Sequence, residues 1–407
     1  MAEMWMGLRR CSCDGGETRC DCCGSELYCG AACDHGDLER KRAARRETDA
    51  DLGGFIALEK LVALDRARTA VVSPSSLLSA MGAASLAMDD VAKRDIAGAF
   101  GTAAANAGAA RAAAAAAGSC NSIWFADSAT GRMPGAIAFA KSAAEAYGAT
   151  VAFGATARRI NAWVKEKTRG AIEKIVADGD VSGSRMIVAN ALAFKCKWER
   201  PFDARRSVDD SPFNGGKTRC RMMRRPSESV YGVFSAEGFG CVLDLAQEPS
   251  AAPAGAGDYR LRVVLAMRRD AAMPGECFVR GVASAAKTLP DVAVSVPATS
   301  ASLEPRDVKA LLGLREALEP GHIAFDRTLS VTRIVHCARL EFDELGAEGA
   351  AATAVVFRCT AVLRAHPETH EMTFDRPFFA GVAVYGRESR EPITFAFASF
   401  VVDPSKG

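Results

Sequence analysis

The sequence lacks a long apolar run, and it lacks an excess of charge of either sign. Its 407 residues include 51 Lys and Arg against 49 Asp and Glu, so the formal net charge is only +2. Such a balance gives no overall attraction to nucleic acid or to an anionic membrane. No run of about 18 apolar residues predicts a membrane span, and the opening stretch MAEMWMGLRRCSC lacks the apolar centre of a secretory signal peptide. We therefore expect an intracellular protein, cytoplasmic or nuclear, whose thiols are reduced.

Cysteine is abundant only near the amino terminus, where seven of the 14 cysteines lie within the first 33 residues. In a reducing compartment this density favours a metal site over disulfides. The pattern C-x2-C-x5-C-x3-C at residues 20–33 resembles the latter part of a MYND-type zinc finger, although the preceding pair is C-x-C and the closing His and Cys of that family are absent. His35 or Cys22 is an alternative ligand, and a Cys-rich tail without metal, or one with disulfides, remains open. The predicted zinc ligands are Cys11, Cys13, Cys20, Cys23, Cys29 and Cys33.

A basic run, ERKRAARR at residues 39–46, separates this segment from the rest of the chain. The run is either a nuclear-localisation or nucleic-acid patch or, more simply, a solvated linker. We therefore divide the chain into a Cys-rich zinc-binding segment with a basic linker, 1–46, and one large domain, 47–407. The stretch DLGGFIALEKLVAL from Asp51 has the apolar spacing of an amphipathic helix. Residues 103–118 are mostly alanine and nearly uncharged, which argues against a basic helix that binds glycosaminoglycans.

A run of small residues, ELGAEGAAATAVV at 344–356, is the most informative stretch of the chain. In a strand, alternate side chains face opposite sides of the sheet. One face would carry small uncharged side chains from Ala347 onward, whereas Glu348 and Arg358 would share the opposite, solvated face. Small side chains lower the steric barrier to insertion between existing strands, and an inserted strand gains a ladder of backbone hydrogen bonds. The alternative is an alanine-rich helix or a flexible linker.

Four further motifs occur in order along the chain: SPSS at 73–76, NAWV at 161–164, NALAFKCKW at 190–198 and FDRPF at 374–378. Together with the small-residue run, they resemble the serpin family over nearly the whole length of the chain. The resemblance implies an α+β serpin fold with three β-sheets, about nine helices and an exposed reactive-centre loop, preceded here by the small Cys-rich segment. It implies no catalytic residue and no cofactor for this domain.

The resemblance also implies a protease inhibitor that acts as a suicide substrate. A target protease of the serine or cysteine type attacks the loop and forms an acyl-enzyme. The cleaved loop then inserts into the main sheet, carries the protease across the molecule and distorts its active site before water can release it. The free energy comes from a native fold that is held in a less stable packing until the loop inserts.

Family spacing, counted from Gly346, places the reactive bond between Thr360 and Ala361. Small residues at this bond would suit an elastase-like protease. An arginine there would instead favour a trypsin-like protease. No Asp occurs at residues 345–372, so recognition by a caspase is not expected. The alternative positions for the reactive bond are Arg358, Cys359 and Arg364.

Further residues receive roles from the resemblance alone. The hinge, which enters the sheet first, comprises Glu344, Gly346, Ala347, Glu348, Gly349, Ala350, Ala351, Ala352 and Thr353. The shutter, a polar cluster beneath the central strands, comprises Ser73, Ser76, Asn190 and His336. The breach, where the loop enters the sheet, contains Trp198. Replacing Asn190 or His336 is expected to favour premature insertion or polymers, because a buried polar network is costly when half-satisfied. Gly349 stands where the family usually has Ala, and Gly weakens a strand by about 0.5–1 kcal/mol, which would slow insertion.

Two other functions remain open. A serpin without inhibitory activity would act as a binding or chaperone module. A cysteine-dependent hydrolase would use Cys359 with His366 or His370, but a loop without rigid support is a poor place for an oriented catalytic pair. The expected partners are the target protease and a peptide or protein partner of the zinc finger, without membrane or nucleic acid. The expected setting is a viral inhibitor of a host protease.

Overall fold

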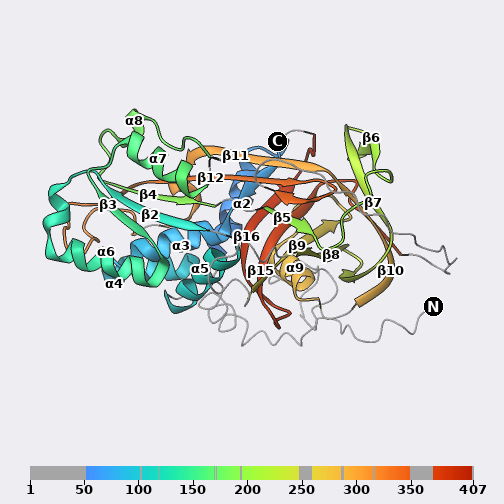
Figure 1. Cartoon of the computed structure of the whole chain (residues 1–407), viewed down its shortest axis with the longest axis horizontal. Helices are drawn as coiled ribbons and strands as arrows, with labels where there is room; N and C mark the ends of the chain where they lie inside the picture. The colour runs from blue at the N-terminus through green and yellow to red at the C-terminus, as the bar shows by residue number, and fades with distance from the viewer. Residues whose placement is uncertain are drawn as a thin grey trace, which may run out of the picture.

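The computed structural model describes most of the chain after residue 51. The described residues are 52–100, 103–117, 119–168, 170, 172–192, 195–246, 259–285, 288–314, 317–348 and 370–405. Within them, backbone hydrogen bonds join sixteen strands into one continuous network, and eight α-helices pack against it (Figure 1). This confirms the predicted mixture of helices and sheet.

A long central sheet runs through the molecule. Its strands are β2 (Cys120–Phe125), β3 (Thr150–Phe153), β4 (Met186–Ala191), β5 (Lys195–Trp198), β11 (Thr299–Asp307), β12 (Val331–Phe342) and β13 (Gly346–Glu348). β2 pairs in parallel with β3 and antiparallel with β4, and β4 pairs in parallel with β12. One edge of β12 pairs with β11, while the opposite edge faces β4 and then β13. β5 follows β4 along the chain, and the NALAFKCKW motif spans the last two residues of β4 and all of β5.

The other strands form a curved arrangement beside the central sheet. They are β1 (Ala70–Val72), β6 (Val208–Phe213), β7 (Thr218–Phe234), β8 (Gly238–Ala246), β9 (Tyr259–Arg268), β10 (Thr288–Pro297), β14 (His370–Thr373), β15 (Phe378–Gly386) and β16 (Pro392–Val401). The order β1-β16-β15-β9-β8 is antiparallel throughout, and β8 also pairs with β5, which connects this arrangement to the central sheet. β6 and β10 pair with β7, and β14 pairs in parallel with β10. Nearly every residue of β15 and β16 is buried, which explains their almost continuous apolar sequence.

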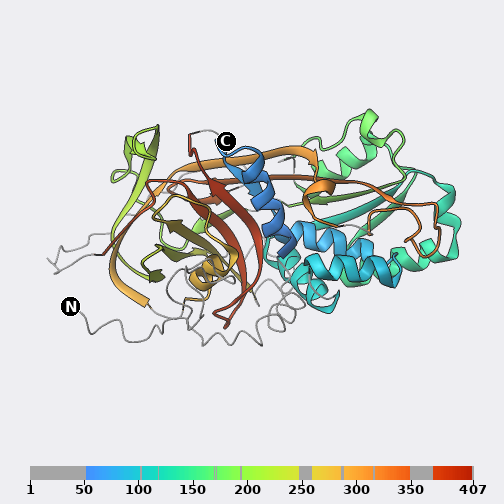
Figure 2. The same ribbon diagram turned by 180° about the vertical axis from the view of Figure 1, so that it is seen from behind.

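Helices cover both faces of the central sheet. On one face lie α3 (Pro74–Ser85), α4 (Asp90–Phe100), α5 (Ala103–Ala117) and α6 (Pro134–Tyr147), with α2 (Leu52–Leu64) beside them (Figures 1 and 2). On the opposite face lie α7 (Ala157–Lys167) and α8 (Asp178–Val181). The remaining helix, α9 (Glu276–Ala283), packs on β8 and β9. Helices therefore cover one face of the central sheet and only part of the other, where the side chain of Arg339 on β12 is exposed.

Helix α3 lies at the centre of the core, and all 12 of its residues are buried. Ser73 caps its first turn by accepting a hydrogen bond from the Ser76 backbone N–H, and Pro74 occupies the first helical position. The alanine-rich run 103–118 supplies α5, which packs against α3. Small side chains allow this close approach, and those of Ala109 and Ala113 are buried.

The amphipathic helix predicted from Asp51 is present as α2, which begins at Leu52. In the part of the chain that the structure describes, no helix is both long and apolar enough to cross a membrane. The predicted zinc ligands and the basic run lie outside the described residues. The zinc site and the division of the chain at residues 46 and 47 therefore stay predictions.

Candidate functional site in the central sheet

The first residues of the predicted hinge already lie inside the central sheet. β13 runs antiparallel to β12, where Phe342 pairs with Ala347, and antiparallel to β5, where Ala347 pairs with Cys196. Ala347 is completely buried, as expected for the face of small residues. The sequence left open whether this stretch lies in solvent or between strands. The structure places Gly346, Ala347 and Glu348 between two strands.

Gly346 lies at the closest approach between β13 and β5. A Cβ atom at this position would be 2.1 Å from the Cys196 carbonyl oxygen and 2.9 Å from the Lys197 Cα. Both neighbours are backbone atoms, which cannot rotate away as a flexible side chain would. A glycine is therefore required for the backbone to lie this close to β5.

A tight turn joins β12 to β13 and reverses the chain. The Asp343 backbone N–H donates to the Gly346 carbonyl oxygen over 3.1 Å, which closes the hairpin. The Asp343 carboxylate also accepts hydrogen bonds from the backbone N–H groups of Leu345, at 2.8 Å, and Gly346, at 2.9 Å. One acidic side chain thus organises the turn from inside, as Asp commonly does.

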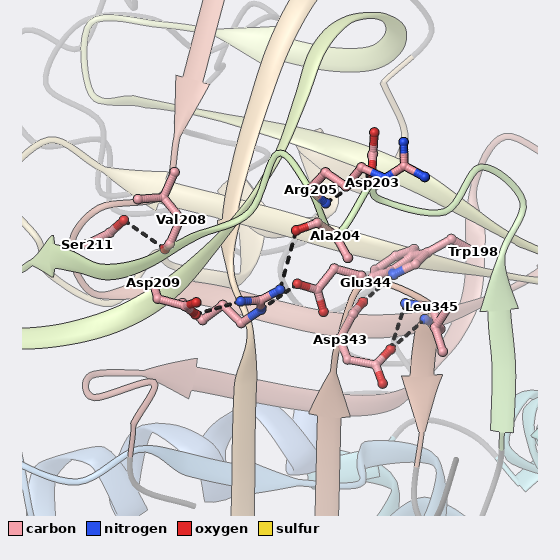
Figure 3. A network of polar contacts seen from close by, with 12 residues as sticks. Trp198, Asp203, Ala204, Arg205, Val208, Asp209, Ser211, Asp343, Glu344 and Leu345 are labelled. Atoms are coloured by element: carbon pink, nitrogen blue, oxygen red, sulfur yellow. Dashed lines mark hydrogen bonds and ion pairs between the residues drawn. The ribbon is translucent and has the colours of Figure 1, made fainter. Parts of the chain in front are cut away.

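Trp198, the last residue of β5, and Phe202 shortly after it form hydrogen bonds with the same turn. The Trp198 indole N–H donates to the Asp343 carbonyl oxygen over 2.7 Å, and the Trp198 backbone N–H donates to the Leu345 oxygen over 3.0 Å. The Phe202 backbone N–H donates to the Glu344 oxygen over 2.9 Å. Figure 3 shows Trp198, Asp343, Glu344 and Leu345 gathered at this point. The entry of the hinge into the sheet is therefore fixed by the backbone as well as by side chains.

Aromatic packing holds Trp198 itself. Its ring stacks on Phe342, with 6.0 Å between centroids, and meets the edge of Phe202 at 5.6 Å. The Arg225 guanidinium lies 4.0 Å from the Phe202 centroid and 5.7 Å from that of Trp198. A cation over an aromatic face contributes about 0.5–2 kcal/mol. Trp198 thus lies where the predicted breach would be and joins the end of β5 to the end of β12.

An ion-pair network reaches the turn from β7. The Arg221 Nε donates to Glu344 Oε1 over 2.6 Å, and its Nη1 donates to Asp209 Oδ1 over 2.6 Å. Only 14% of the Glu344 side chain is exposed. Burial alone would raise the pKa of the Glu344 carboxyl, but the Ser207 hydroxyl and the Arg221 guanidinium outweigh it and lower that pKa below its usual value. Glu344 is therefore a paired carboxylate at neutral pH.

Further along the sheet, β12 separates from its neighbour on the hinge side. β12 and β4 pair only as far as Val335 and Ala189, and β13 reaches β12 only at Glu341 and Phe342. Among the described residues, four of the five between, His336, Ala338, Arg339 and Leu340, have ladder partners on β11, and none of the five has one on the hinge side. We call this edge of β12 along His336–Leu340 the slot. At ~3.3 Å per residue the slot is ~16 Å long, which suits about five residues of inserted strand.

Three of the predicted shutter residues meet at the start of the slot. His336 Nε2 accepts a hydrogen bond from the Ser73 backbone N–H over 3.1 Å. The Ser73 hydroxyl oxygen lies 2.6 Å from the Ser76 hydroxyl and 2.6 Å from the Ala396 carbonyl oxygen. All of these groups are buried. The cluster therefore joins the amino-terminal end of α3 to β12 and β16.

Asn190, predicted for the same cluster, forms hydrogen bonds toward β2 and the residue that precedes it. Its Nδ2 donates to Asn121 Oδ1 over 2.7 Å and to Ser119 Oγ over 3.3 Å. Asn121 in turn donates to the Tyr147 carbonyl oxygen over 3.4 Å. Since Asn190 and His336 each follow the last pair of the β4–β12 ladder, two separate polar clusters flank the point where the strands part.

Acid is expected to destabilise the protein through His336. Burial lowers the pKa of His336 from 6.5 to about 4, so between these values the unfolded chain binds a proton that the folded chain does not. The stability contributed by neutral His336 is complete above pH 6.5 and falls as the pH approaches 4, by up to about 3 kcal/mol. Urea unfolding across this range, with His336→Gln as control, checks the expectation, because Gln can accept the hydrogen bond from Ser73 but does not titrate. An equal acid-induced loss in both proteins would contradict it.

Most of the remaining predicted residues fall outside the described part of the chain, and their roles stay predictions. His370, proposed for the hydrolase alternative, is described and begins β14 with an exposed side chain, whereas its partners Cys359 and His366 are not described. The undescribed hinge and reactive-bond residues are Gly349, Ala350, Ala351, Ala352, Thr353, Arg358, Cys359, Thr360, Ala361 and Arg364.

Sequence reasoning missed Arg221, Asp209 and Asn121. A local signal existed for the first of these, because Arg219 and Arg221 are two residues apart in a strand and therefore share a face. Nothing in the local sequence indicated that the carboxylate partner of Arg221 lies 123 residues away.

The described residues offer no evident metal centre. No group of three or more His, Cys, Asp or Glu side chains in this part of the chain is placed to hold a metal ion. Burial raises the pKa of the Cys337 thiol to about 12 and that of Cys220 to about 11, so both are protonated, unreactive thiols at neutral pH.

Known families and curated proteins show a consistent similarity. The family described as serpin (serine protease inhibitor) matches residues 54–395. Iripin-1 of Ixodes ricinus is 28% identical over 231 residues, and Serpin A3-7 of Bos taurus is 29% identical over 241 residues. Leukocyte elastase inhibitor A of Rattus norvegicus is 27% identical over 241 residues. These matches cover 54%, 56% and 54% of this chain and 56%, 54% and 60% of the relatives. The chain thus spans little more than half the length of the curated relatives that it matches.

Solved structures extend the similarity of the fold to most of the chain. Native protease nexin-1 with heparin superposes with a TM-score of 0.67 at 17% identity, covering 89% of this chain and 99% of that chain. Arabidopsis AtSerpin1 in its native stressed conformation gives a TM-score of 0.66 at 18% identity, covering 88% and 98%. Thyroxine-binding globulin with thyroxine gives 0.64 at 18% identity, covering 89% and 99%. At these identities the matches show the fold alone, and the predicted fold is confirmed.

Proposed function

The chain belongs to the serpin family, and from this premise we propose that it is a protease inhibitor, not an enzyme, that traps its target by inserting its cleaved loop into the central sheet. The observation that carries the proposal is the hairpin formed by β12 and β13. Ala347 and Glu348 are already paired with both β12 and β5, and Gly346 is paired with β5. The slot continues directly from them along the same edge of β12. An inserted strand therefore has a defined starting point and a defined path.

The side chains that would follow β13 into the slot suit its interior. Ala347 is buried, so strand alternation assigns Gly349, Ala351 and Thr353 to the same side of the sheet. All of these side chains are small and none is charged. Insertion would therefore bury no ionised group, and each added residue would gain backbone hydrogen bonds to strands that are already in place.

The proposed reaction is an interrupted hydrolysis. The protease nucleophile, a Ser oxygen or a Cys sulfur, attacks the carbonyl carbon of Thr360 and forms an ester or thioester. The bond to the Ala361 nitrogen breaks, and that nitrogen leaves as an amine after taking up a proton. Insertion of the freed hinge then carries the attached protease away from the Ala361 side before water can cleave the ester.

The proposal is tested by incubating the full chain with elastase-like, trypsin-like and cysteine proteases. We expect at least one complex that survives SDS, and mass spectrometry of the released fragment then locates the reactive bond. Ala351→Arg should be cleaved at the same bond without forming the complex, because the guanidinium would have to enter the core. Cleavage of the wild-type chain without any stable complex would favour the alternative of a non-inhibitory binding or chaperone module.

The finer parts of the proposal rest on the sequence alone. They are a zinc site formed by the amino-terminal cysteines, a peptide or protein partner of that segment, and an intracellular, viral setting. The rat leukocyte elastase inhibitor among the relatives is in keeping with a target that accepts small residues at Thr360 and Ala361.

A further inference from the structure

The ion-pair network at the hinge begins at a bulge in β6. The register of β6 and β7 shifts by one residue, so that Asp209 and Asp210 of β6 lie opposite the single residue Arg221 of β7. Asp210 has a φ of 56°, in the left-handed region that Asp adopts more readily than most residues. Asp209 pairs with Arg221, and Asp210 pairs with Arg219 at 3.1 Å. The bulge thus gives each carboxylate its own arginine on β7.

Two other donors of Arg221 face the β12–β13 turn and the segment that precedes β6. Its Nε donates to Glu344 at the tip of the β12–β13 turn, and its Nη2 lies 3.5 Å from the Ala204 carbonyl oxygen. Figure 3 shows the side chains of Asp209 and Glu344 close to each other, and the Arg221 guanidinium bonds to both. The Asp209 side chain is 76% exposed, whereas that of Glu344 is 14% exposed. Water therefore screens the outer pair more than the pair at the hinge.

Removing Arg221 would leave Glu344 as a poorly hydrated carboxylate without a counter-charge. An unpaired carboxylate in such a position is costly, so it either returns to water or takes up a proton. The turn can restore hydration by moving outward. β13 would then leave the sheet with it, because only three residues hold β13 between its neighbours.

We propose that Arg221 is a positioning residue for the loop, which holds the hinge residues Gly346–Glu348 in the sheet before any cleavage by clamping Glu344. The geometry of the clamp stands by itself, and its effect on inhibition rests on the proposed function. A seated hinge keeps the starting pairs of the inserted strand formed. It also removes three residues, about 10 Å of extended chain, from the connection between β12 and β14. Arg221 therefore keeps the start of the inserted strand formed and shortens the free loop that a protease can reach.

Hydrogen–deuterium exchange on the full chain tests the clamp directly. In Arg221→Gln, we expect the backbone amides of Ala347 and Glu348 to exchange about tenfold faster than in the wild type, a shift that corresponds to ~1.4 kcal/mol. Arg219→Gln is the matched control. It removes a guanidinium from the same face of the same strand, but its ion pair with Asp210 lies at the surface, with side chains 54% and 72% exposed. We expect it to leave these two amides unchanged.

A charge reversal separates positioning from a general loss of stability. The double variant Arg221→Glu with Glu344→Arg should recover part of the protection of Ala347 and Glu348, because it restores the pair at the turn while the new carboxylate faces Asp209. Either single change should recover none. Cleavage between residues 349 and 369 by a non-trapped protease should be several-fold faster in Arg221→Gln than in Arg219→Gln. Equal exchange in these two variants would overturn the proposal, as would faster exchange spread evenly over all core amides. Neither readout requires a trapped protease, so failure of the clamp and failure of the inhibitory function are distinguishable.

Discussion

Cleavage between Glu348 and His370 is expected to raise the melting temperature of this serpin by about 10–20 °C. The five slot residues of an inserted strand would each form two backbone hydrogen bonds, which at ~1 kcal/mol net per bond amounts to a gain on the order of 10 kcal/mol. For a domain of this size, 1 kcal/mol shifts the melting temperature by roughly 1–2 °C. The measurement is calorimetry before and after limited proteolysis, with the cut located by mass spectrometry.

Two substitutions four and five residues after Ala347 distinguish insertion from other causes of stabilisation. Ala351 shares the buried face of Ala347 by strand alternation, whereas Ala352 belongs to the opposite face. Cleaved Ala351→Arg should melt like the uncleaved protein, and cleaved Ala352→Arg should gain as much as the wild type. A wild-type protein whose melting temperature does not change on cleavage, or two variants that behave alike, would refute insertion along the slot.

Gly346→Ala is expected to expel the hinge from the sheet in the intact protein. The new Cβ would lie 2.1 Å from the Cys196 carbonyl oxygen, which is too close for β13 and β5 to stay paired. Loss of about three backbone hydrogen bonds at ~1 kcal/mol each corresponds to roughly a hundredfold faster amide exchange at Ala347 and Glu348. Hydrogen–deuterium exchange of these two amides is the measurement.

Gly98→Ala supplies the control for that experiment. Gly98 lies within helix α4, where a Cβ would meet no atom within 4 Å. Alanine there should stabilise the protein by about 0.5–1 kcal/mol and leave exchange at the hinge unchanged. Wild-type protection of Ala347 in Gly346→Ala would show that β13 tolerates a wider separation from β5 than its geometry indicates.

The inward face of the small-residue run could be predicted from the sequence because side-chain alternation is a local property. Period-two alternation assigns Ala347 to one side of a strand wherever that strand lies, and the structure buries this side chain. The cap formed by Ser73 and Pro74 is equally local, since it lies within one turn of α3.

The contacts that control the hinge could not be read in this way. Arg221 and Glu344 are 123 residues apart, and Ser73 and His336 are 263 apart. The sequence grouped Asn190 with His336, but the structure bonds Asn190 to Asn121 on the neighbouring strand. Each of these side chains has several chemically equivalent partners in the chain, and only the order of the strands selects one.

The amino-acid sequence by itself determined which face of the small-residue run can be buried and where α3 begins, because propensity, side-chain alternation and capping act over a few residues. Only the tertiary structure decided that Gly346–Glu348 lie between β12 and β5, that Arg221 bonds to Glu344 and that the pairing of β4 with β12 ends before His336. These features depend on which strands become neighbours, and that choice is made by the packing of the whole core.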